Sequence, residues 1–299
     1  MTDAPPPVRT VRVVRAGALT TVQDLGRPGY AHLGVGRSGA LDPAAHTLLN
    51  RLVGNPPDAA TLETTLTGIT LSPSTGLVLA VGGAAAAVRI DGRPAPWGQA
   101  VWVPGGARLD VGPAHYGLRC YVALAGGVAA EPVLGSRSSD LLSGLGPAPL
   151  RDGDLLPVGE PTGRAAEADP LPWSVPPRSG PVGVVDLPIR PGPRADRITP
   201  AAWRRLVEAE YVVASASNRI ALRLSGPALE RRGPDTVPSE GAVLGAVQVP
   251  ADGRPILFMA DHPTVGGYPV VGVVTPAGLA AAAQAAPGCA VRFRQVTVD

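Results

Sequence analysis

The chain has 299 residues, 45% of them hydrophobic, and a formal net charge of +2. This length allows one large domain or two of ordinary size, and the apolar content is too high for a disordered chain despite 38 glycines and 35 prolines. The arginines form no basic block, no apolar run reaches about 18 residues, and the N-terminus lacks the apolar core of a signal peptide. We therefore expect a cytoplasmic protein that binds neither nucleic acid nor membranes.

Short apolar runs separated by turn residues predict strands through most of the chain. In the N-terminal half, these runs cover residues 77–81, 88–90, 101–103, 109–111 and 118–124. In the C-terminal half, they cover residues 182–185, 220–224, 243–249, 256–259, 270–274 and 291–298. Asp91-Gly92 and Asp252-Gly253 stand between such runs, and an Asp-Gly pair favours a hairpin turn.

Three helices are expected, and all of them begin in the same way. Asp42-Pro43, Thr199-Pro200 and Thr275-Pro276 each place a capping side chain before a proline that suits the first helical turn. With many strands and few helices, the sequence predicts a mainly β protein, either all-β or built from barrels.

A proline-rich stretch divides the chain into two halves. Residues 157–181 contain seven prolines and no periodic apolar pattern, which is typical of a boundary between lobes. We expect an N-terminal lobe (1–160), a proline-rich linker (161–180) and a C-terminal lobe (181–299).

The chain contains no lysine, and all 26 of its positively charged lysine or arginine residues are arginines. A P-loop, a pyridoxal phosphate site and a biotin attachment site each need a lysine, so another chain would have to supply any ATP or biotin chemistry. The four histidines have no metal-ligand spacing, and no metal site is expected. Cys120 and Cys289 lie in or beside apolar strand patterns, which predicts inert thiols.

A dense polar segment runs from Thr20 to Asp42. It places Gln23, Asp24, Arg27, Arg37 and Ser38 among glycines, whose backbone amides can approach a ligand closely. An arginine fork suits a carboxylate or a phosphate. A turn-rich hairpin held by an Asp24–Arg27 pair is an equally good interpretation of this segment.

A second polar segment runs from Ser239 to Pro269. Glu240 opens a hairpin, and Asp261, Thr264, Gly266, Gly267 and Tyr268 follow a strand. An acid, a hydroxyl and exposed amides after a buried strand are typical of an anion or amide site. The structural alternative is a β-bulge with a capped turn. Residues 135–140 have a similar composition, and they too could form either an anion or amide site or a purely structural turn.

These segments together resemble the family called carboxyltransferase domain, subdomains A and B, which includes the C subunit of 5-oxoprolinase (also called allophanate hydrolase subunit 2). The similar segments are spread over nearly the whole chain. Its most distinctive parts are GALTTVQDLGRPGYAHLGVGRSGALDP (17–43), SNRIALRLSGP (217–227), PSEGAVLGAVQVPADGRPI (238–256) and ADHPTVGGYPV (260–270). Where relatives often carry a second threonine, this chain has Val265, which leaves Thr264 as the hydroxyl of that turn.

The resemblance implies two cyclophilin-like β-barrel lobes and a multi-subunit enzyme. In that enzyme, a B subunit, from a family of kinase-inhibitor-like proteins, joins this chain to phosphorylate the substrate, and a separate A subunit opens the ring. The implied reaction is 5-oxo-L-proline + ATP + water to L-glutamate + ADP + phosphate, with ATP bound mainly with or by a partner chain. We expect the isolated chain to be inactive.

Two other functions remain open from the same resemblance. One is a subunit of a biotin-dependent urea or allophanate amide carboxyltransferase, with biotin on another chain. The other is a non-enzymatic antagonist of a kinase inhibitor.

The family pattern supplies no established catalytic residue, so the site is predicted from the residue types alone. We predict Asp24, Arg37 and Asp261 to be catalytic. We predict the substrate to be bound by Gln23, Arg27, Ser38, Glu240, Thr264, Gly266, Gly267 and Tyr268. The two polar segments are expected to face a shared cleft or the partner chain.

Overall fold

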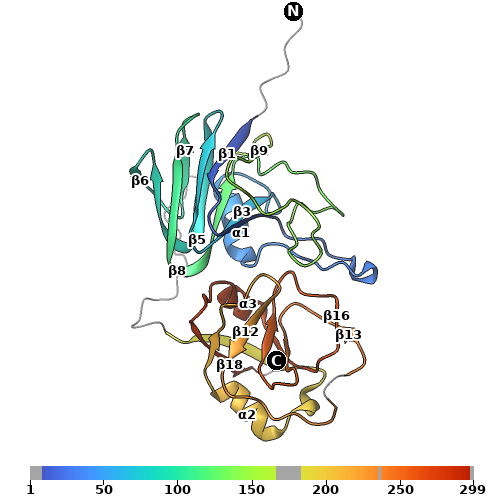
Figure 1. Cartoon of the computed structure of the whole chain (residues 1–299). Helices are drawn as coiled ribbons and strands as arrows, with labels where there is room; N and C mark the ends of the chain where they lie inside the picture. The colour runs from blue at the N-terminus through green and yellow to red at the C-terminus, as the bar shows by residue number, and fades with distance from the viewer. Residues whose placement is uncertain (1–8, 166–182, 235–236, 297–299) are drawn as a thin grey trace, which may run out of the picture. The chain divides into compact units, whose positions relative to one another are not determined.

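The computed structural model describes residues 9–165, 183–234 and 237–296, and these fall into two compact units (Figure 1). The N-terminal unit contains 9–26, 43–139 and 145–165, and the C-terminal unit contains 27–42, 140–144 and the described residues from 183 onward.

The predicted lobe 1–160 is therefore interrupted, because 27–42 and 140–144 pack with the C-terminal unit. Two hydrogen bonds explain this arrangement: Ser38 N–H donates to the carbonyl of Ala260, and Leu141 N–H donates to the carboxylate of the Asp261 side chain. Most of the predicted linker 161–180 lies outside the described residues.

The N-terminal unit is built on a nine-stranded sheet whose neighbouring strands run antiparallel. The main path is β2-β3-β8-β4-β1-β9, and β5 joins it through β8 and also pairs with β6 and β7. The strands are β1 (Thr10–Arg15), β2 (Leu19–Gln23), β3 (Thr61–Thr65), β4 (Ile69–Pro73), β5 (Leu77–Ile90), β6 (Arg93–Ala95), β7 (Ala100–Val103), β8 (Leu109–Leu124) and β9 (Leu155–Pro157).

Two of these strands are longer than the sequence predicted. The runs 77–81 and 88–90 belong to the single strand β5, and 109–111 and 118–124 belong to β8. β5 pairs with β8 along most of its length, and the register shifts between Gly83 and Val88. The sequence missed this continuity because the connecting residues of β5 are glycine and alanine, which carry little strand signal.

Alternating side chains of the sheet form the core of the N-terminal unit, which includes Val13, Leu62, Leu79, Leu109 and Val122. Helix α1 (Pro43–Leu52) contacts β5 and β8 and buries one side of its surface. The unit is thus a twisted sheet with one long helix packed on it.

The C-terminal unit contains a closed barrel of seven strands in the order β10-β17-β14-β15-β12-β11-β18. β10 and β18 pair in parallel, and the other neighbours are antiparallel. The strands are β10 (Val185–Pro191), β11 (Tyr211–Val213), β12 (Ala221–Ser225), β14 (Ala246–Gln248), β15 (Ile256–Phe258), β17 (Val270–Val274) and β18 (Ala290–Gln295). A separate two-stranded sheet joins β13 (Glu240–Gly241) to β16 (Val265–Gly266).

Helices α2 (Pro200–Glu208) and α3 (Pro276–Ala283) contact β18 and β10 of the barrel (Figure 1). Both begin as the sequence predicted: Thr199 Oγ1 accepts from Ala202 N–H at 3.1 Å, and Thr275 Oγ1 accepts from Gly278 N–H at 3.4 Å. None of the helices in the described part of the chain is long and apolar enough to cross a membrane.

The prediction of a mainly β protein is confirmed, but the prediction of two barrels is only half right. Among the described residues, the N-terminal sheet stays open, with β2 and β9 at the two ends of its main path. β9 has only three residues and pairs with β1 alone, which leaves no strand pair to close the ring.

Candidate functional site

The segment 27–42 forms a closed loop in the C-terminal unit. Its base is tied by a hydrogen bond from Arg27 N–H to the carbonyl of Arg37, at 2.8 Å. Between these two residues, a short 3-10 turn, η1 (Ala31–Leu33), has no buried residue. The Arg37 side chain is exposed, whereas Ser38 is buried.

A buried carboxylate, Asp261, holds this loop against the barrel. Its Oδ1 accepts from Ser38 Oγ at 2.7 Å, and its Oδ2 accepts from Leu141 N–H at 3.0 Å. Arg219 donates from Nη2 to Oδ1 and from Nε to Oδ2, both at 3.0 Å. The same Nη2 also donates to the carbonyl of Gly39 at 2.7 Å. One carboxylate thus joins the loop, the segment 140–144 and Arg219, which lies two residues before β12.

The geometry of this cluster determines what Asp261 can do. Asp261 and Arg219 are both almost fully buried, and their contact is the two-pronged pairing in which a guanidinium binds a carboxylate most strongly. With four donors on its two oxygens, the carboxylate is better suited to fixing the segments than to exchanging protons with a substrate. Sequence reasoning missed Arg219, because a single arginine at the start of an apolar run is a weak signal for a buried charge.

Ser38 has an unusual backbone at the point where the loop meets Asp261. Its φ of 54° lies in the left-handed region, which costs a residue with a side chain on the order of 1–3 kcal/mol. Gly36, two residues earlier, approaches the His262 carbonyl so closely that an added Cβ would lie 3.0 Å from that oxygen. Such strain persists only where surrounding contacts enforce it, and it is found most often at functional sites.

A second buried charge lies at the base of the loop. Arg27 Nη1 lies 4.0 Å from Asp140 Oδ2, and both side chains are buried. Asp140 also accepts hydrogen bonds from Leu142 N–H at 2.8 Å and from Ser143 Oγ at 2.7 Å. These contacts fold the segment 140–144 into a capped turn beside the loop.

His262, next to Asp261, is held as a neutral ring. Its Nδ1 lies 2.7 Å from the carbonyl of Pro263, so that nitrogen carries the proton, and its ring stacks on Phe258. Burial lowers the pKa of His262, although the nearby carboxylates of Asp261 and Asp140 act in the opposite direction.

The remaining residues predicted in the second segment lie on the small β13–β16 sheet of the same unit. Glu240 pairs with Gly266 in the ladder, and its carboxylate accepts from Arg194 Nε at 2.9 Å. The carbonyl of Thr264 accepts from Ala242 N–H, and the Tyr268 side chain is exposed. A Cβ on Gly266 would lie 2.6 Å from Gln248 Nε2, so only glycine fits there without a shift.

Gln23 and Asp24, by contrast, belong to the N-terminal unit. The Asp24 carboxylate is buried and accepts from Ser136 Oγ at 2.6 Å, Arg137 N–H at 2.6 Å and Ser138 Oγ at 2.5 Å, as well as from Gly26 N–H. Gln23 Nε2 donates to Thr21 Oγ1 and to the carbonyl of Ser139, both at 3.0 Å. The predicted site residues therefore divide between two units.

Comparison with known proteins identifies the family. The model of the carboxyltransferase domain, subdomain A and B, matches residues 33–295, which is most of the chain. The chain belongs to this family. It is 35% identical to the 5-oxoprolinase C subunit of Escherichia coli (strain K12) over 97% of this chain and 92% of that protein. With the Haemophilus influenzae protein of the same name, it is 31% identical over 93% and 89%.

Urea-metabolising proteins contain a similar domain. Urea amidolyase of Lachancea kluyveri is 30% identical over 94% of this chain, which spans only 16% of that longer protein. The crystal structure of TTHA0988 superposes with a TM-score of 0.82 at 36% identity, over 96% of this chain and 56% of that one. The Kluyveromyces lactis urea carboxylase structure superposes with a TM-score of 0.88 at 27% identity, over 96% and 27%.

Cys120 is not activated as a nucleophile in this carboxyltransferase-domain chain. Burial raises the pKa of Cys120 to about 12, and its Sγ lies 3.4 Å from the carbonyl of Ala84, so its thiol stays protonated at neutral pH. Within the residues that the structure covers, no group of three or more His, Cys, Asp or Glu side chains could hold a metal ion.

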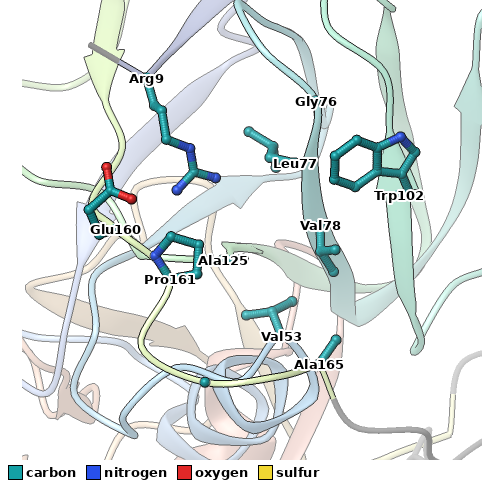
Figure 2. Close-up of a pocket in the computed structure, with 11 residues that line it drawn as sticks. Arg9, Val53, Gly76, Leu77, Val78, Trp102, Ala125, Glu160, Pro161 and Ala165 are labelled. Atoms are coloured by element: carbon teal, nitrogen blue, oxygen red, sulfur yellow. The ribbon is translucent and has the colours of Figure 1, made fainter. Parts of the chain in front are cut away.

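A cavity of about 360 Å³ lies in the N-terminal unit (Figure 2). Trp102, Leu77 and Pro161 contribute to its walls, and the Arg9 guanidinium points toward it while donating to the carbonyl of Gly159 at 2.8 Å. None of the predicted site residues lines this cavity. It therefore adds nothing to the site built around Asp261.

Proposed function

We propose that this chain belongs to an ATP-dependent 5-oxoprolinase, in which it acts with a B-subunit homologue to phosphorylate the lactam oxygen of 5-oxo-L-proline. The A subunit then opens the ring, and the overall products are L-glutamate, ADP and phosphate. The match to 5-oxoprolinase C subunits along nearly the full length of both proteins supports this proposal. We further propose that the complex is cytoplasmic.

The observation that carries the chemistry is the clamped loop that presents Arg37. A lactam is a poor electrophile, and phosphorylation of its oxygen converts that oxygen into a leaving group. This step concentrates negative charge on the lactam oxygen and the transferred phosphoryl group, and a preorganised guanidinium stabilises such charge. Arg37 is exposed on a loop whose base is fixed by Asp261 and Arg219, so its backbone is already ordered before a ligand arrives.

In this proposal, the two carboxylates have a different role from the one predicted from sequence. Asp261 and Asp24 position the backbone, because each has four hydrogen-bond donors on its oxygens. Arg37 contacts the reacting oxygens. Thr264, Gly266, Gly267 and Tyr268 remain the proposed substrate-binding residues. ATP is bound mainly by the partner, because this chain has no lysine for a P-loop.

A second function, carboxyl transfer to an amide such as urea, is favoured by one observation. The urea carboxylase structure superposes on this chain as well as the TTHA0988 structure does. In that case, biotin would be attached to another chain.

One experiment separates the two functions. The complex co-purified with its A and B subunits is assayed for ATP hydrolysis with 5-oxoproline, with urea and bicarbonate, and with neither. We expect stimulation by 5-oxoproline alone, and no turnover by the purified single chain. Stimulation by urea and bicarbonate without any effect of 5-oxoproline would favour the carboxyl-transfer function instead.

A further inference from the structure

Half of the exposed large apolar side chains in the described residues lie on the segments that carry the candidate site. Ten large hydrophobic residues are exposed in the described part of the chain, and five of these lie on the loop 27–42, the segment 140–144 and the stretch around β13 and β16. We call them the apolar rim. Its members are Leu33 (61% exposed), Leu142 (49%), Val243 (53%), Val265 (56%) and Tyr268 (39%).

Hydrogen bonds attach two of the rim-bearing segments to Asp261 and hold the third together as a small sheet. Leu33 lies on the loop closed by Arg27 and Arg37, which Ser38 attaches to Asp261. Leu142 follows Leu141, whose N–H donates to the same carboxylate. On the small sheet, Gly241 pairs with Val265, and Ala242 N–H donates to the carbonyl of Thr264 at 2.9 Å.

Burial of its own side chains does not explain the position of the loop's tip. The turn η1, which ends at Leu33, has no buried residue. Its position depends instead on buried charged groups at the base of the loop, Arg27 and Asp140 on one side and Arg219 and Asp261 on the other. An exposed loop held in one conformation loses little conformational entropy when a partner binds, which is the usual advantage of preorganised interfaces.

The charge of the loop indicates the chemistry of its partner. Residues 27–37 contain two arginines and one histidine and no acidic residue, and the Arg37 side chain is exposed. Protein interfaces typically combine an apolar centre with charges that complement the opposite face. The matching surface is therefore apolar and carries negative charge opposite Arg37, which the phosphates of a bound nucleotide would supply.

We propose that the apolar rim is the docking surface for the B-subunit homologue, and that this partner closes the candidate site from the side of Arg37. The inference rests on the proposed function, in which a second chain must bring the nucleotide-binding groups that a lysine-free chain lacks. The reaction would then take place between the two chains, with Arg37 from this chain facing ATP held by the partner.

The test measures association of the full-length chain with its B-subunit homologue by isothermal titration calorimetry. Leu33→Asp and Val265→Asp each place a charge at an exposed rim position and should leave the melting temperature unchanged. Each is expected to weaken the Kd about tenfold or more, since truncated interface anchors commonly have effects of this size. Leu155→Asp is the matched control, because Leu155 is 57% exposed on β9 of the N-terminal unit. The Kd of this variant for the B-subunit homologue should equal that of the wild-type chain.

A second measurement follows the closing of the site directly. The Arg37 side chain is exposed in the free chain, so phenylglyoxal, which modifies accessible guanidinium groups, should react with it, and mass spectrometry measures the modified fraction. The B-subunit homologue should protect Arg37 from modification in the wild-type complex, and this protection should be lost at the same protein concentrations in Leu33→Asp.

The outcomes distinguish the two proposals. If the wild-type chain binds the B-subunit homologue and the rim variants bind equally well, the rim is not the docking surface, although the proposed function survives. If light scattering shows that the rim variants instead abolish a dimer of this chain, the occupant is a second copy and the inference is wrong. If the wild-type chain does not bind the B-subunit homologue at all, both proposals fail.

Discussion

The two units each bury a carboxylate at a junction of loops, and they neutralise it in different ways. Asp24 in the N-terminal unit accepts from two serine hydroxyls and two backbone amides. Asp261 in the C-terminal unit accepts from one hydroxyl, one backbone amide, and both Nε and Nη2 of Arg219.

The difference concerns what happens when one partner is lost. Neutral donors can rearrange or bind water, whereas a buried guanidinium without its carboxylate is an uncompensated charge. The cluster around Asp261 is therefore the more fragile of the two, and it is also the one that supports the loop with Arg37. Three sets of variants and one pH dependence test this contrast.

The largest effect is expected from Arg219→Met, which leaves Asp261 buried without its counter-charge. Loss of one member of a buried pair typically costs about 3–5 kcal/mol of stability. Urea unfolding of the full chain measures this change. The double variant Arg219→Met, Asp261→Leu removes both charges and should regain most of the loss. A single variant within about 1 kcal/mol of the wild type would contradict our account of the cluster.

The second prediction concerns Arg37, which the cluster holds but does not bury. Arg37→Ala should lower kcat of the assembled complex by about a hundredfold or more, because it removes charge stabilisation in the transition state. The melting temperature should not change, because the side chain is exposed. Arg151→Ala, at another exposed arginine, is the control. A lower melting temperature with normal activity per folded molecule would show that Arg37 is part of the scaffold.

The third prediction tests the milder cluster. Asp24→Asn keeps the shape of the side chain but removes the charge that strengthens its hydrogen bonds, so we expect a loss of about 1.5–3 kcal/mol. Turnover per folded molecule should remain normal, because no reacting group depends on Asp24 in our proposal. Stability and turnover are measured on one sample, and a hundredfold loss of turnover in a folded variant would restore the catalytic role predicted from sequence.

The smallest effect is a pH dependence that both units share. Burial lowers the pKa of His46 in the N-terminal unit and of His262 in the C-terminal unit below the ordinary value of 6.5. The unfolded chain therefore takes up protons first as the pH falls, and stability decreases below about pH 6.5 with a slope of at most about 1.4 kcal/mol per pH unit for each group. Urea unfolding at pH 7.5 and pH 5.5 measures this decrease.

The variant His46→Gln tests the assignment in the N-terminal unit. The buried ring of His46 has Nδ1 2.9 Å from Thr61 Oγ1 and Nε2 3.3 Å from Asn50 Nδ2, contacts that suit a neutral imidazole. Without it, the stability should depend less steeply on pH between 7.5 and 5.5. An unchanged slope would mean that His46 does not contribute.

Local patterns in the sequence were sufficient for much of the secondary structure and for the family. The three helices were predictable because their threonine or aspartate caps and first-turn prolines act over only a few residues. The Asp91-Gly92 turn was predictable for the same reason, since both residues take the positive φ of the hairpin turn and Ile90 pairs with Arg93. Long, distinctive stretches such as 17–43 carried the family resemblance.

The tertiary structure alone decided which distant residues meet. Asp261 is paired with Ser38, which is 223 residues away in sequence, and with Arg219, and no local pattern encodes either contact. The transfer of 27–42 to the C-terminal unit, the open N-terminal sheet and the pairing that makes β5 continuous are equally non-local. Turns, helix caps and the family could be predicted from the sequence, because each of them depends on neighbouring residues. The partners of each buried charge depend on how the whole chain packs, because a charge removed from water must find its counter-charge wherever the fold provides one.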